Sequence, residues 1–374
     1  MRKYVLIPDS FKGTMSSLDV CRIVTDAILS QEPDAAVCAI PVADGGEGTV
    51  DAFLSAVGGQ RIPVNCTGPY GEPITACYGL LPDGTAVVEM AAAAGLPMVG
   101  EHRNAERTTT YGVGQLIVHA ARHGARQIVL ALGGSATNDG GCGAVGVRFL
   151  NAAGKAFVPV GATLKDVARI DTAAMDEAVR RVPFTTMCDI DNPLCGPTGA
   201  SAVFGPQKGA DAAMVRRLDD GLRQLAGVIR RDLDCDVLDL PGGGAAGGFG
   251  AGAAAFFRSP LRMGIDVVLS LTAFDRRAAD ADLVITGEGK LDSQSLRGKV
   301  VIGVARRAKA LGVPVAALVG ASELDVAAAY AVGVSGIFPI NPAPAPFDQV
   351  KSLCRAHLRF TAENLIHFFR AVHP

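Results

Sequence analysis

The sequence predicts an α/β fold of two domains, with a parallel-sheet, Rossmann-like domain built from both chain ends and an α+β domain inserted between them. Short apolar segments alternate with segments of helical periodicity at both ends, the pattern of β-α-β units. In the middle, apolar segments are joined by short Pro/Gly turns, as in hairpins. The length of 374 residues suits two domains. We expect residues 1–60 and 280–374 to form the first domain and residues 61–279 the second.

The composition excludes several classes of protein. With 49% hydrophobic and 19% charged residues, the chain can build a large core and is not expected to be disordered. A net charge of −2 gives no field for nucleic acid or an anionic membrane, so we expect neither as a partner. The nine Cys form no Cys-x-x-Cys pair, which indicates reduced thiols. Because no signal peptide or membrane span is evident, the sequence predicts a soluble, cytoplasmic protein.

The first elements are expected to form one β-α-β unit. A buried strand is predicted over Tyr4–Ile7, where a short apolar run ends at a proline. Ser16 and Asp19 have the spacing of a capping box, and apolar residues then recur at helical spacing over Leu18–Leu29. Ala36–Val42 is the second predicted strand.

The middle of the chain reads differently. Pro/Gly turns separate three apolar segments, which we expect to pair as antiparallel hairpins, and two longer segments have helical periodicity. The expected strands are 62–65, 74–81 and 85–90, and the expected helices are 109–123 and 211–233.

The C-terminal part returns to alternating strands and helices. Gly312 stands where a helix commonly ends on a residue with a left-handed backbone. With the N-terminal strands, this part completes a sheet of about five parallel strands. The expected strands are 282–286, 313–319 and 336–340, and the expected helices are 298–311, 325–332 and 348–372.

Chemistry is expected in the loops, because ligands favour the carboxyl ends of parallel strands and clefts between domains. We therefore place the active site in the cleft between the two domains. The first loop, 9–14, offers Ser10 and Lys12 ahead of a helix N-terminus, a setting that suits a phosphate or a carboxylate. A plain turn with a solvated lysine is the alternative.

The second loop, 43–49, follows the second strand. It places Asp44 beside Gly45 and Gly46, and a carboxylate in such a loop suits magnesium binding or acid/base chemistry. A tight turn with a capping aspartate is the alternative.

The third loop, 133–141, follows an apolar strand and is the most ligand-like stretch of the chain. Backbone N–H groups bared by glycines such as Gly134, together with the hydroxyls of Ser135 and Thr137, can cradle phosphate oxygens. Asp139 adds a carboxylate to this candidate binding site.

The fourth loop, 188–194, contains Asp189, Asp191 and Asn192. The two aspartates alternate along an extended segment, so we expect only one of them to face the cleft. Lys208 precedes the helix expected from residue 211 and is a candidate cation, with a solvated lysine as the alternative.

Two further loops complete the set. The fifth, 240–252, is so rich in glycine that it implies close approach to something large such as a nucleotide, with tight helix packing as the alternative. The sixth follows the strand expected to end at Thr286 and carries Gly287, Glu288 and Asp292.

The six loops carry carboxylates, lysines, hydroxyls and glycines, and no catalytic His is evident. This combination favours phosphoryl transfer, whose catalysis is mostly positioning and charge neutralisation. The sequence contains no Walker-type phosphate loop, no zinc-ligand spacing and no Gly-x-Ser-x-Gly elbow. Two Gly-x-Gly-x-x-Gly matches occur, but neither links a predicted strand directly to a helix.

Several of these motifs together resemble one known family, the bacterial type-1 glycerate kinases. The resemblance is carried, in order along the chain, by residues 8–13, 43–49, 133–137, 191–194, 204–210, 286–289 and 292–294. It implies phosphorylation of D-glycerate, with ATP as co-substrate and Mg²⁺ as cofactor, to give 2-phosphoglycerate. It also implies a two-domain fold with the active site in the cleft.

The resemblance and the loop chemistry together suggest residue roles. Asp189 is expected to be the carboxylate nearest the glycerate hydroxyl. Lys12 and Lys208 are expected to neutralise phosphate or the substrate carboxylate. Mg²⁺ is expected at Asp44, Glu288 and Asp292, and the binding residues are expected to be Ser10, Asp44, Gly45, Gly46, Gly134, Ser135, Thr137, Asp139, Asn192, Gly287 and Glu288.

Two other functions fit the sequence less well. An NAD(P)-dependent oxidoreductase would use the Gly-x-Gly-x-x-Gly matches, and a non-catalytic sensor of a small hydroxy acid would keep the fold without the reaction. The sequence leaves a homo-oligomer open.

Overall fold

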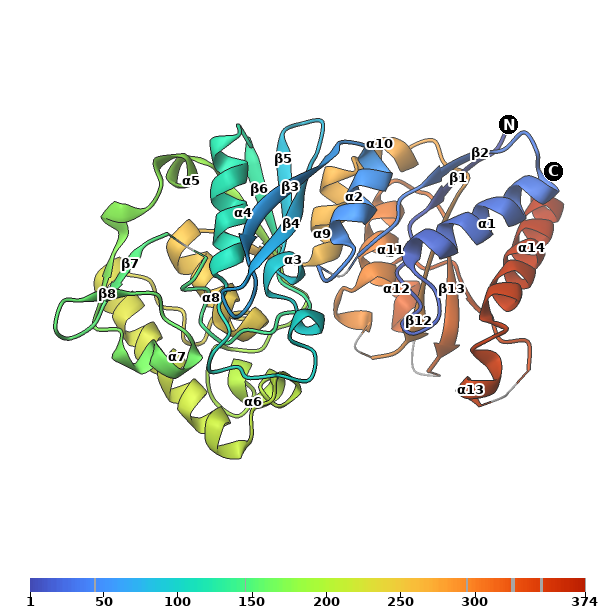
Figure 1. Ribbon diagram of the computed structural model, residues 1–374. Coiled ribbons are helices and arrows are strands. Elements are labelled where there is room, and N and C mark those ends of the chain that lie inside the picture. The colour runs from blue at the N-terminus through green and yellow to red at the C-terminus, as the bar shows by residue number, and fades with distance from the viewer. Residues whose placement is uncertain (44, 145, 294, 324–326, 344–345, 374) are drawn as a thin grey trace. The chain divides into compact units, whose positions relative to one another are not determined.

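The computed structural model describes residues 1–374 except 44, 145, 294, 324–326, 344–345 and 374 (Figure 1). The chain forms two units, each with its own sheets and core. Unit 1 comprises residues 1–44, 55–57 and 263–374, and unit 2 comprises residues 45–54 and 58–262.

Unit 1 is built on a five-stranded sheet in the order β14-β13-β12-β1-β2. Every pairing is parallel, and Tyr4 lies opposite Val37 on one side and Leu283 on the other. The parallel sheet predicted from both chain ends is therefore confirmed. Its strands are β1 (Lys3–Leu6), β2 (Ala36–Ala39), β12 (Leu283–Leu291), β13 (Val315–Ser322) and β14 (Gly336–Pro339).

Helices cover both faces of this sheet. α1 and α14 lie side by side on one face (Figure 1), and Val24 and Leu358 pack there with Leu6. α11 packs on β12 and against α9, where a Cβ on Gly303 would lie 2.7 Å from Ile265 Cγ2. The helices are α1 (Ser17–Gln31), α9 (Gly264–Leu271), α10 (Phe274–Ala278), η5 (Ser295–Arg297), α11 (Val300–Ala310), α12 (Ala328–Val332), α13 (Phe347–Val350) and α14 (Cys354–Val372).

Two local signals in unit 1 predict the structure correctly. The capping box of Ser16 and Asp19 is present, and Gly312 has a φ of +73° after α11. The single helix expected over 348–372 is instead two helices, α13 and α14. They are separated by a tight turn in which the Leu353 N–H donates to Val350 three residues back.

The strand expected to end at Thr286 continues as β12 to Leu291. β12 keeps pairing with β13 as far as Leu291 opposite Ser322, so Gly287 and Glu288 belong to a strand and not to a loop. The glycines that suggested a loop instead permit close strand pairing, since a Cβ on Gly287 would lie 2.2 Å from the Leu318 carbonyl oxygen.

Unit 2 contains a six-stranded mixed sheet in the order β11-β10-β6-β5-β4-β3. The antiparallel hairpins predicted for the middle of the chain are confirmed as β3-β4-β5. The other half, β5-β6-β10-β11, is parallel, and burial of every residue of β5 and β10 is typical of parallel strands. The strands are β3 (Gln60–Thr67), β4 (Pro73–Leu80), β5 (Thr85–Glu89), β6 (Gln127–Ala131), β10 (Phe184–Met187) and β11 (Leu261–Arg262).

The rest of unit 2 surrounds this sheet. A small antiparallel sheet, β8-β7-β9, is formed by Arg148–Leu150 (β7), Ala156–Phe157 (β8) and Arg169–Asp171 (β9). The helices that lie wholly or mainly in this unit are α2 (Thr49–Val57), α3 (Ala91–Ala94), η1 (Leu96–Val99), α4 (Tyr111–Arg122), η2 (Gly161–Asp166), η3 (Thr172–Ala174), α5 (Glu177–Arg181), α6 (Ala200–Phe204), η4 (Pro206–Lys208), α7 (Ala212–Leu233) and α8 (Ala245–Phe257).

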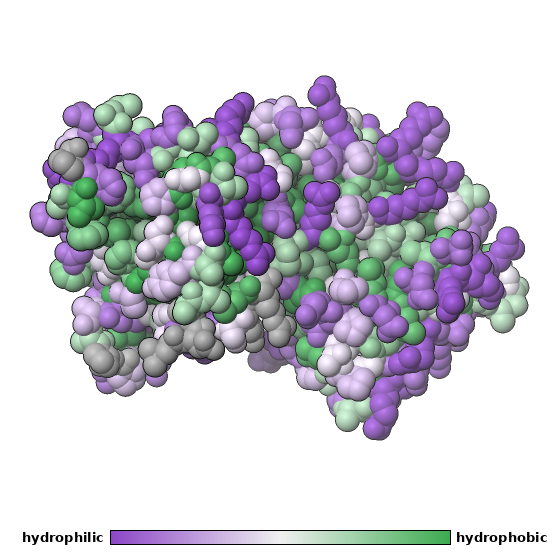
Figure 2. Space-filling model, turned by 180° about the vertical axis from the view of Figure 1, so that it is seen from behind, coloured by the Kyte–Doolittle hydropathy of each residue, from purple (hydrophilic) through white to green (hydrophobic). Residues whose placement is uncertain are grey.

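Within the described part of the chain, no helix combines the length and apolar character that crossing a membrane requires. Hydrophilic side chains cover much of the face shown in Figure 2.

Candidate active site

Three strands of unit 2 end together at one edge of its sheet. β5, β6 and β10 are parallel neighbours, with Glu89 opposite Ala131 and Ala131 opposite Met187 at their carboxyl ends. The predicted loops 133–141 and 188–194 therefore leave the sheet side by side.

Residues 45–49 of the second predicted loop join the same edge. The Gly133 N–H donates to the Gly45 carbonyl oxygen at 2.7 Å, and a Cβ on Gly133 would lie 2.6 Å from the backbone nitrogen of Gly46. Only glycine permits this approach, so the structure brings the second, third and fourth predicted loops together. Asp44, predicted to bind metal and substrate, lies outside the described residues.

Hydroxyl groups order the first half of the loop 133–141. Ser135 Oγ and Thr137 Oγ1 are 2.9 Å apart, and Ser135 Oγ also accepts the Thr137 N–H at 3.1 Å. Gly134, with a φ of +72°, is exposed beside these buried hydroxyls. Gly134, Ser135 and Thr137, all predicted as binding residues, thus form one cluster.

Lys208 lies beneath this cluster and not on its surface. Its Nζ donates to the Thr137 carbonyl oxygen at 2.6 Å and to Ser135 Oγ at 3.5 Å, and only 2% of the residue is exposed. Burial lowers the pKa of the Lys208 amine to about 7, and the charge of Asp139 opposes this shift. The amine is positioned to hold the loop through these two hydrogen bonds.

Asp139 anchors the second half of the loop. Its carboxylate is completely buried and accepts the N–H and the hydroxyl of Thr110, both at 2.8 Å, and the Gly141 N–H at 3.0 Å. Burial raises the pKa of Asp139, and these hydrogen bonds oppose the rise. With its oxygens occupied by backbone and hydroxyl donors, Asp139 stabilises the loop and the start of α4.

The segment after β10 carries the aspartate expected to act on the substrate hydroxyl. Asp189 is half-buried and Asp191 is exposed, in keeping with their alternation along an extended chain. Asn192 has a structural role. Its side-chain Nδ2 donates to the Thr198 carbonyl oxygen at 2.8 Å, and its backbone carbonyl oxygen accepts the Gly244 N–H at 3.0 Å.

The glycines of the fifth loop, 240–252, meet the protein's own backbone. A Cβ on Gly247 would lie 2.0 Å from the Thr137 carbonyl oxygen, and one on Gly250 would lie 2.2 Å from that of Gly242. Gly247 lies at a kink within α8, where residues 246–248 have left-handed backbone angles and contact the loop 133–141. Tight packing against the protein's own backbone, at this kink for Gly247 and along the helix for Gly250, therefore accounts for these glycines.

A second group of predicted residues lies at the carboxyl edge of the unit 1 sheet. The Asp9 N–H donates to the Gly287 carbonyl oxygen at 2.8 Å, and the Ser10 N–H donates to Asp9 Oδ1 at 2.6 Å. Lys12 is exposed, and Gly289 lies near it, since a Cβ there would be 3.6 Å from the Lys12 nitrogen. The first and sixth predicted stretches are therefore adjacent.

Glu288 is the most unusual carboxylate of unit 1. It is 7% exposed, and among the described residues its Oε1 is a buried oxygen with no hydrogen-bond partner. Burial raises the pKa of Glu288 to about 7, aided by Asp9 and Asp292, while Ser295 and Lys299 oppose the rise. A buried carboxylate with a free oxygen is a site where a cation would be stabilised.

Mg²⁺ would find few protein ligands in this geometry. The described residues include no group of three or more His, Cys, Asp or Glu that could hold a metal. Mg²⁺ in phosphoryl-transfer sites commonly takes one or two carboxylates and completes its shell with phosphates and water. Oε1 of Glu288 has no hydrogen-bond partner, and Asp292 is close enough to raise the pKa of Glu288. These two carboxylates fit such an open site.

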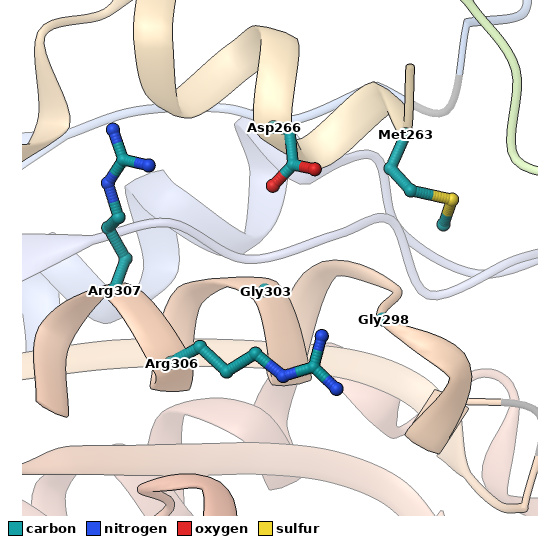
Figure 3. A pocket seen from close by; sticks show the side chains of 6 residues that line it. All are labelled: Met263, Asp266, Gly298, Gly303, Arg306 and Arg307. Carbon is teal, nitrogen blue, oxygen red and sulfur yellow. The ribbon is translucent and has the colours of Figure 1, made fainter. Parts of the chain in front are cut away.

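A separate pocket in unit 1 contains none of the predicted residues. It has a volume of about 200 Å³ between α9 and α11 and is lined by Met263, Asp266, Gly298, Gly303, Arg306 and Arg307 (Figure 3). Arg307 is already paired with Asp275, Nε to Oδ1 at 2.7 Å, and Arg306 is exposed. Its mixture of charges defines no particular ligand.

Sequence reasoning missed Glu89, which lies at the carboxyl edge of unit 2. The residue is buried, with 8% exposed, and its Oε1 accepts the Val50 N–H at 2.5 Å. One signal was available, because Glu89 is a charged residue at the end of an otherwise apolar strand.

Glycine-rich loops, hydroxyls and carboxylates at the carboxyl ends of parallel strands are typical of α/β enzymes that bind small anionic molecules. Comparison with known proteins narrows this class. The model of the Glycerate kinase family matches residues 4–370, so the chain belongs to the glycerate kinase family.

Individual relatives agree over the whole length. The chain is 43% identical to a protein named Glycerate kinase from Bacillus cereus, with 97% of each chain covered. It is 40% identical to Glycerate 2-kinase from Escherichia coli strain K12, covering 96% of this chain and 97% of that one. A solved structure named as a glycerate kinase 2, from Salmonella typhimurium LT2, superimposes with a TM-score of 0.87 at 42% identity, covering 100% and 99% of the two chains.

Proposed function

We propose that this chain transfers the γ-phosphoryl group of ATP to the 2-hydroxyl of D-glycerate, giving 2-phosphoglycerate and ADP. A bond forms between the glycerate oxygen and the γ-phosphorus, the bond from that phosphorus to the β,γ-bridging oxygen breaks, and the hydroxyl proton leaves to a base. The observation that carries the proposal is the match to the Glycerate kinase family over residues 4–370. The name of the Escherichia coli relative, Glycerate 2-kinase, supports the choice of hydroxyl.

At the edge of unit 2, we propose that the phosphoryl group lies against the 133–141 loop. The hydroxyls of Ser135 and Thr137 and the exposed backbone of Gly134 are suitable donors to its oxygens. Lys208 supports this loop through its hydrogen bond to Thr137, and its amine is proposed to supply positive charge near the phosphate. Asp189 is proposed to receive the hydroxyl proton, or to orient the hydroxyl.

At the edge of unit 1, the charged groups suit the polyphosphate. Lys12 is proposed to neutralise phosphate or the glycerate carboxylate. Glu288 and Asp292 would hold Mg²⁺, which neutralises phosphate charge when bound. We place the reaction in a cleft between the two domains expected from the sequence.

The proposal is tested by ADP production from Mg-ATP with D-glycerate, beside L-glycerate, tartronate and no-acid controls, with phosphorus NMR of the product. Turnover with D-glycerate and a 2-phosphate signal is expected. A 3-phosphate signal would overturn the choice of hydroxyl. ATP binding without turnover of any acid would discard glycerate as substrate, and a thermal shift with glycerate but no ATP binding would favour a sensor.

Asp189→Asn should lower kcat by about 10²–10⁴-fold, because it removes the proton acceptor and keeps the side-chain volume. Asp191→Asn is the matched control on the same extended segment, and its exposed side chain should tolerate the change. Circular dichroism establishes that both variants fold. Near-normal turnover of Asp189→Asn, or an equal loss in the control, would reject the assignment.

A further inference from the structure

Glu89 provides the missing cap of a helix beside the candidate site. α2 begins at Thr49, and its N-cap is Gly48, which has no side chain to accept a hydrogen bond. Helices leave their first backbone N–H groups without partners, and a side-chain oxygen from outside can satisfy them. Glu89 Oε1 accepts the Val50 N–H at 2.5 Å, and the Gly48 N–H also hydrogen-bonds to this carboxylate.

Burying this carboxylate has a cost that the helix end offsets. Only 8% of Glu89 is exposed, and burial raises its pKa, with Asp51 adding to the rise. The Val50 and Gly48 donors and the charge of Arg61 oppose this shift, and the helix dipole also favours a negative charge here. A buried carboxylate is retained only where such partners exist.

The segment that Glu89 holds carries two predicted binding residues, Gly45 and Gly46. One end of the segment is fixed by the Gly133 N–H, which donates to the Gly45 carbonyl oxygen at 2.7 Å. The other end is fixed by Glu89 through Gly48 and Val50. Between these two points, Thr49 Oγ1 donates to the Gly46 carbonyl oxygen at 2.7 Å.

The backbone that carries Glu89 is itself fixed by the sheet. Glu89 is the last residue of β5, where it lies opposite Ala131 of β6, and the next residue, Met90, donates its N–H to the Ala131 carbonyl oxygen at 2.8 Å. The strand that positions Glu89 is therefore the neighbour of the strand that leads into the 133–141 loop. One sheet edge sets the places of both glycine loops.

We propose that Glu89 is a positioning residue for phosphoryl transfer, whose carboxylate fixes residues 45–50 against the 133–141 loop without touching the substrate. The inference rests on the proposed function. Glu89 lies outside every predicted motif, and in this proposal it holds the 45–50 segment next to the 133–141 loop.

The test compares Glu89→Ala and Glu89→Gln with Asp176→Ala. Asp176 is the control for the loss of a helix cap, because its carboxylate accepts the Ala178 N–H at 2.9 Å at the start of α5, away from the candidate site, and it also pairs with Arg122. Glu89→Ala should lower kcat by roughly 10²-fold, since small misplacements of binding groups can cost that much. Glu89→Gln keeps one acceptor oxygen and should recover most of the turnover, and Asp176→Ala should lose stability by about 1 kcal/mol without losing turnover.

Hydrogen exchange read by mass spectrometry provides a second measurement that does not depend on the substrate. Faster exchange in Glu89→Ala confined to residues 45–50 and 133–141 is expected, and this result would stand even if glycerate were not the substrate. Wild-type turnover in Glu89→Ala would reduce Glu89 to a helix cap and overturn the proposal. Equal loss of turnover in Glu89→Gln and Glu89→Ala, with exchange at residues 45–50 unchanged in Glu89→Gln, would also overturn it, because the carboxylate would then act directly.

Discussion

At the scale of single residues, burial and charge conflict most directly at Lys208. Lys208 is 2% exposed, and burial lowers the pKa of its amine to about 7, against about 10.4 for an unfolded lysine. Below pH 7 the folded protein carries the full cost of a buried ammonium. As pH rises from 7 towards 10, the folded state releases this proton before the unfolded state does, so that cost is progressively removed.

The stability of the wild type should therefore rise with pH relative to Lys208→Met, by up to about 1.4 kcal/mol per pH unit between pH 7 and 9. Urea unfolding at several pH values measures this slope. Lys165→Met removes an exposed lysine of the same unit and should leave the slope unchanged. A pH-independent difference between wild type and Lys208→Met would mean that Lys208 keeps an ordinary pKa in the fold.

At the scale of elements, glycine has opposite effects in two helices of unit 2. In α8, a Cβ on Gly250 would lie 2.2 Å from the Gly242 carbonyl oxygen, whereas a Cβ on Gly227 in α7 meets nothing within 4 Å. Gly250→Ala should destabilise by about 1–3 kcal/mol through overpacking. Gly227→Ala should stabilise by about 0.5–1 kcal/mol, because alanine loses less backbone entropy in a helix.

Chemical denaturation of the two single variants measures both effects. They are matched in chemistry and differ only in the space around the new methyl group. If Gly250→Ala were as stable as the wild type, the close packing of α8 on the 242–243 turn would be wrong.

The same elements explain which parts of the molecule the sequence reveals. Apolar runs and caps are local signals, so the five parallel strands and the Ser16 capping box were predictable. The length of β12 depends on its pairing with β13, which no local pattern encodes. Glycine was ambiguous for the same reason, since a nucleotide, a neighbouring strand and a packed helix all require a bare backbone.

Much the same holds for the candidate site. Gly134, Ser135 and Thr137 were predictable as a cluster because they are adjacent in sequence. The burial of Lys208 and the role of Glu89 arise from contacts between distant segments, Lys208 with Thr137 and Glu89 with Val50, and only the fold reveals them.

At the scale of the whole molecule, each unit has a core of its own. Leu358 is completely buried in a core cluster formed only by unit 1 residues, and Leu222 in one formed only by unit 2 residues. Replacing either with alanine leaves a cavity that should cost about 2–5 kcal/mol. Because neither cluster includes residues of the other unit, we expect each substitution to lower the stability of one unit only.

Native-state hydrogen exchange, resolved by segment, tests this division. Leu358→Ala should weaken the protection of β1, β12 and β13 and leave that of β5, β6 and β10 nearly unchanged, and Leu222→Ala should do the reverse. The two variants serve as each other's control, since both replace a fully buried leucine. Equal loss of protection across all six strands in both variants would mean that the chain opens as one cooperative body despite its two cores.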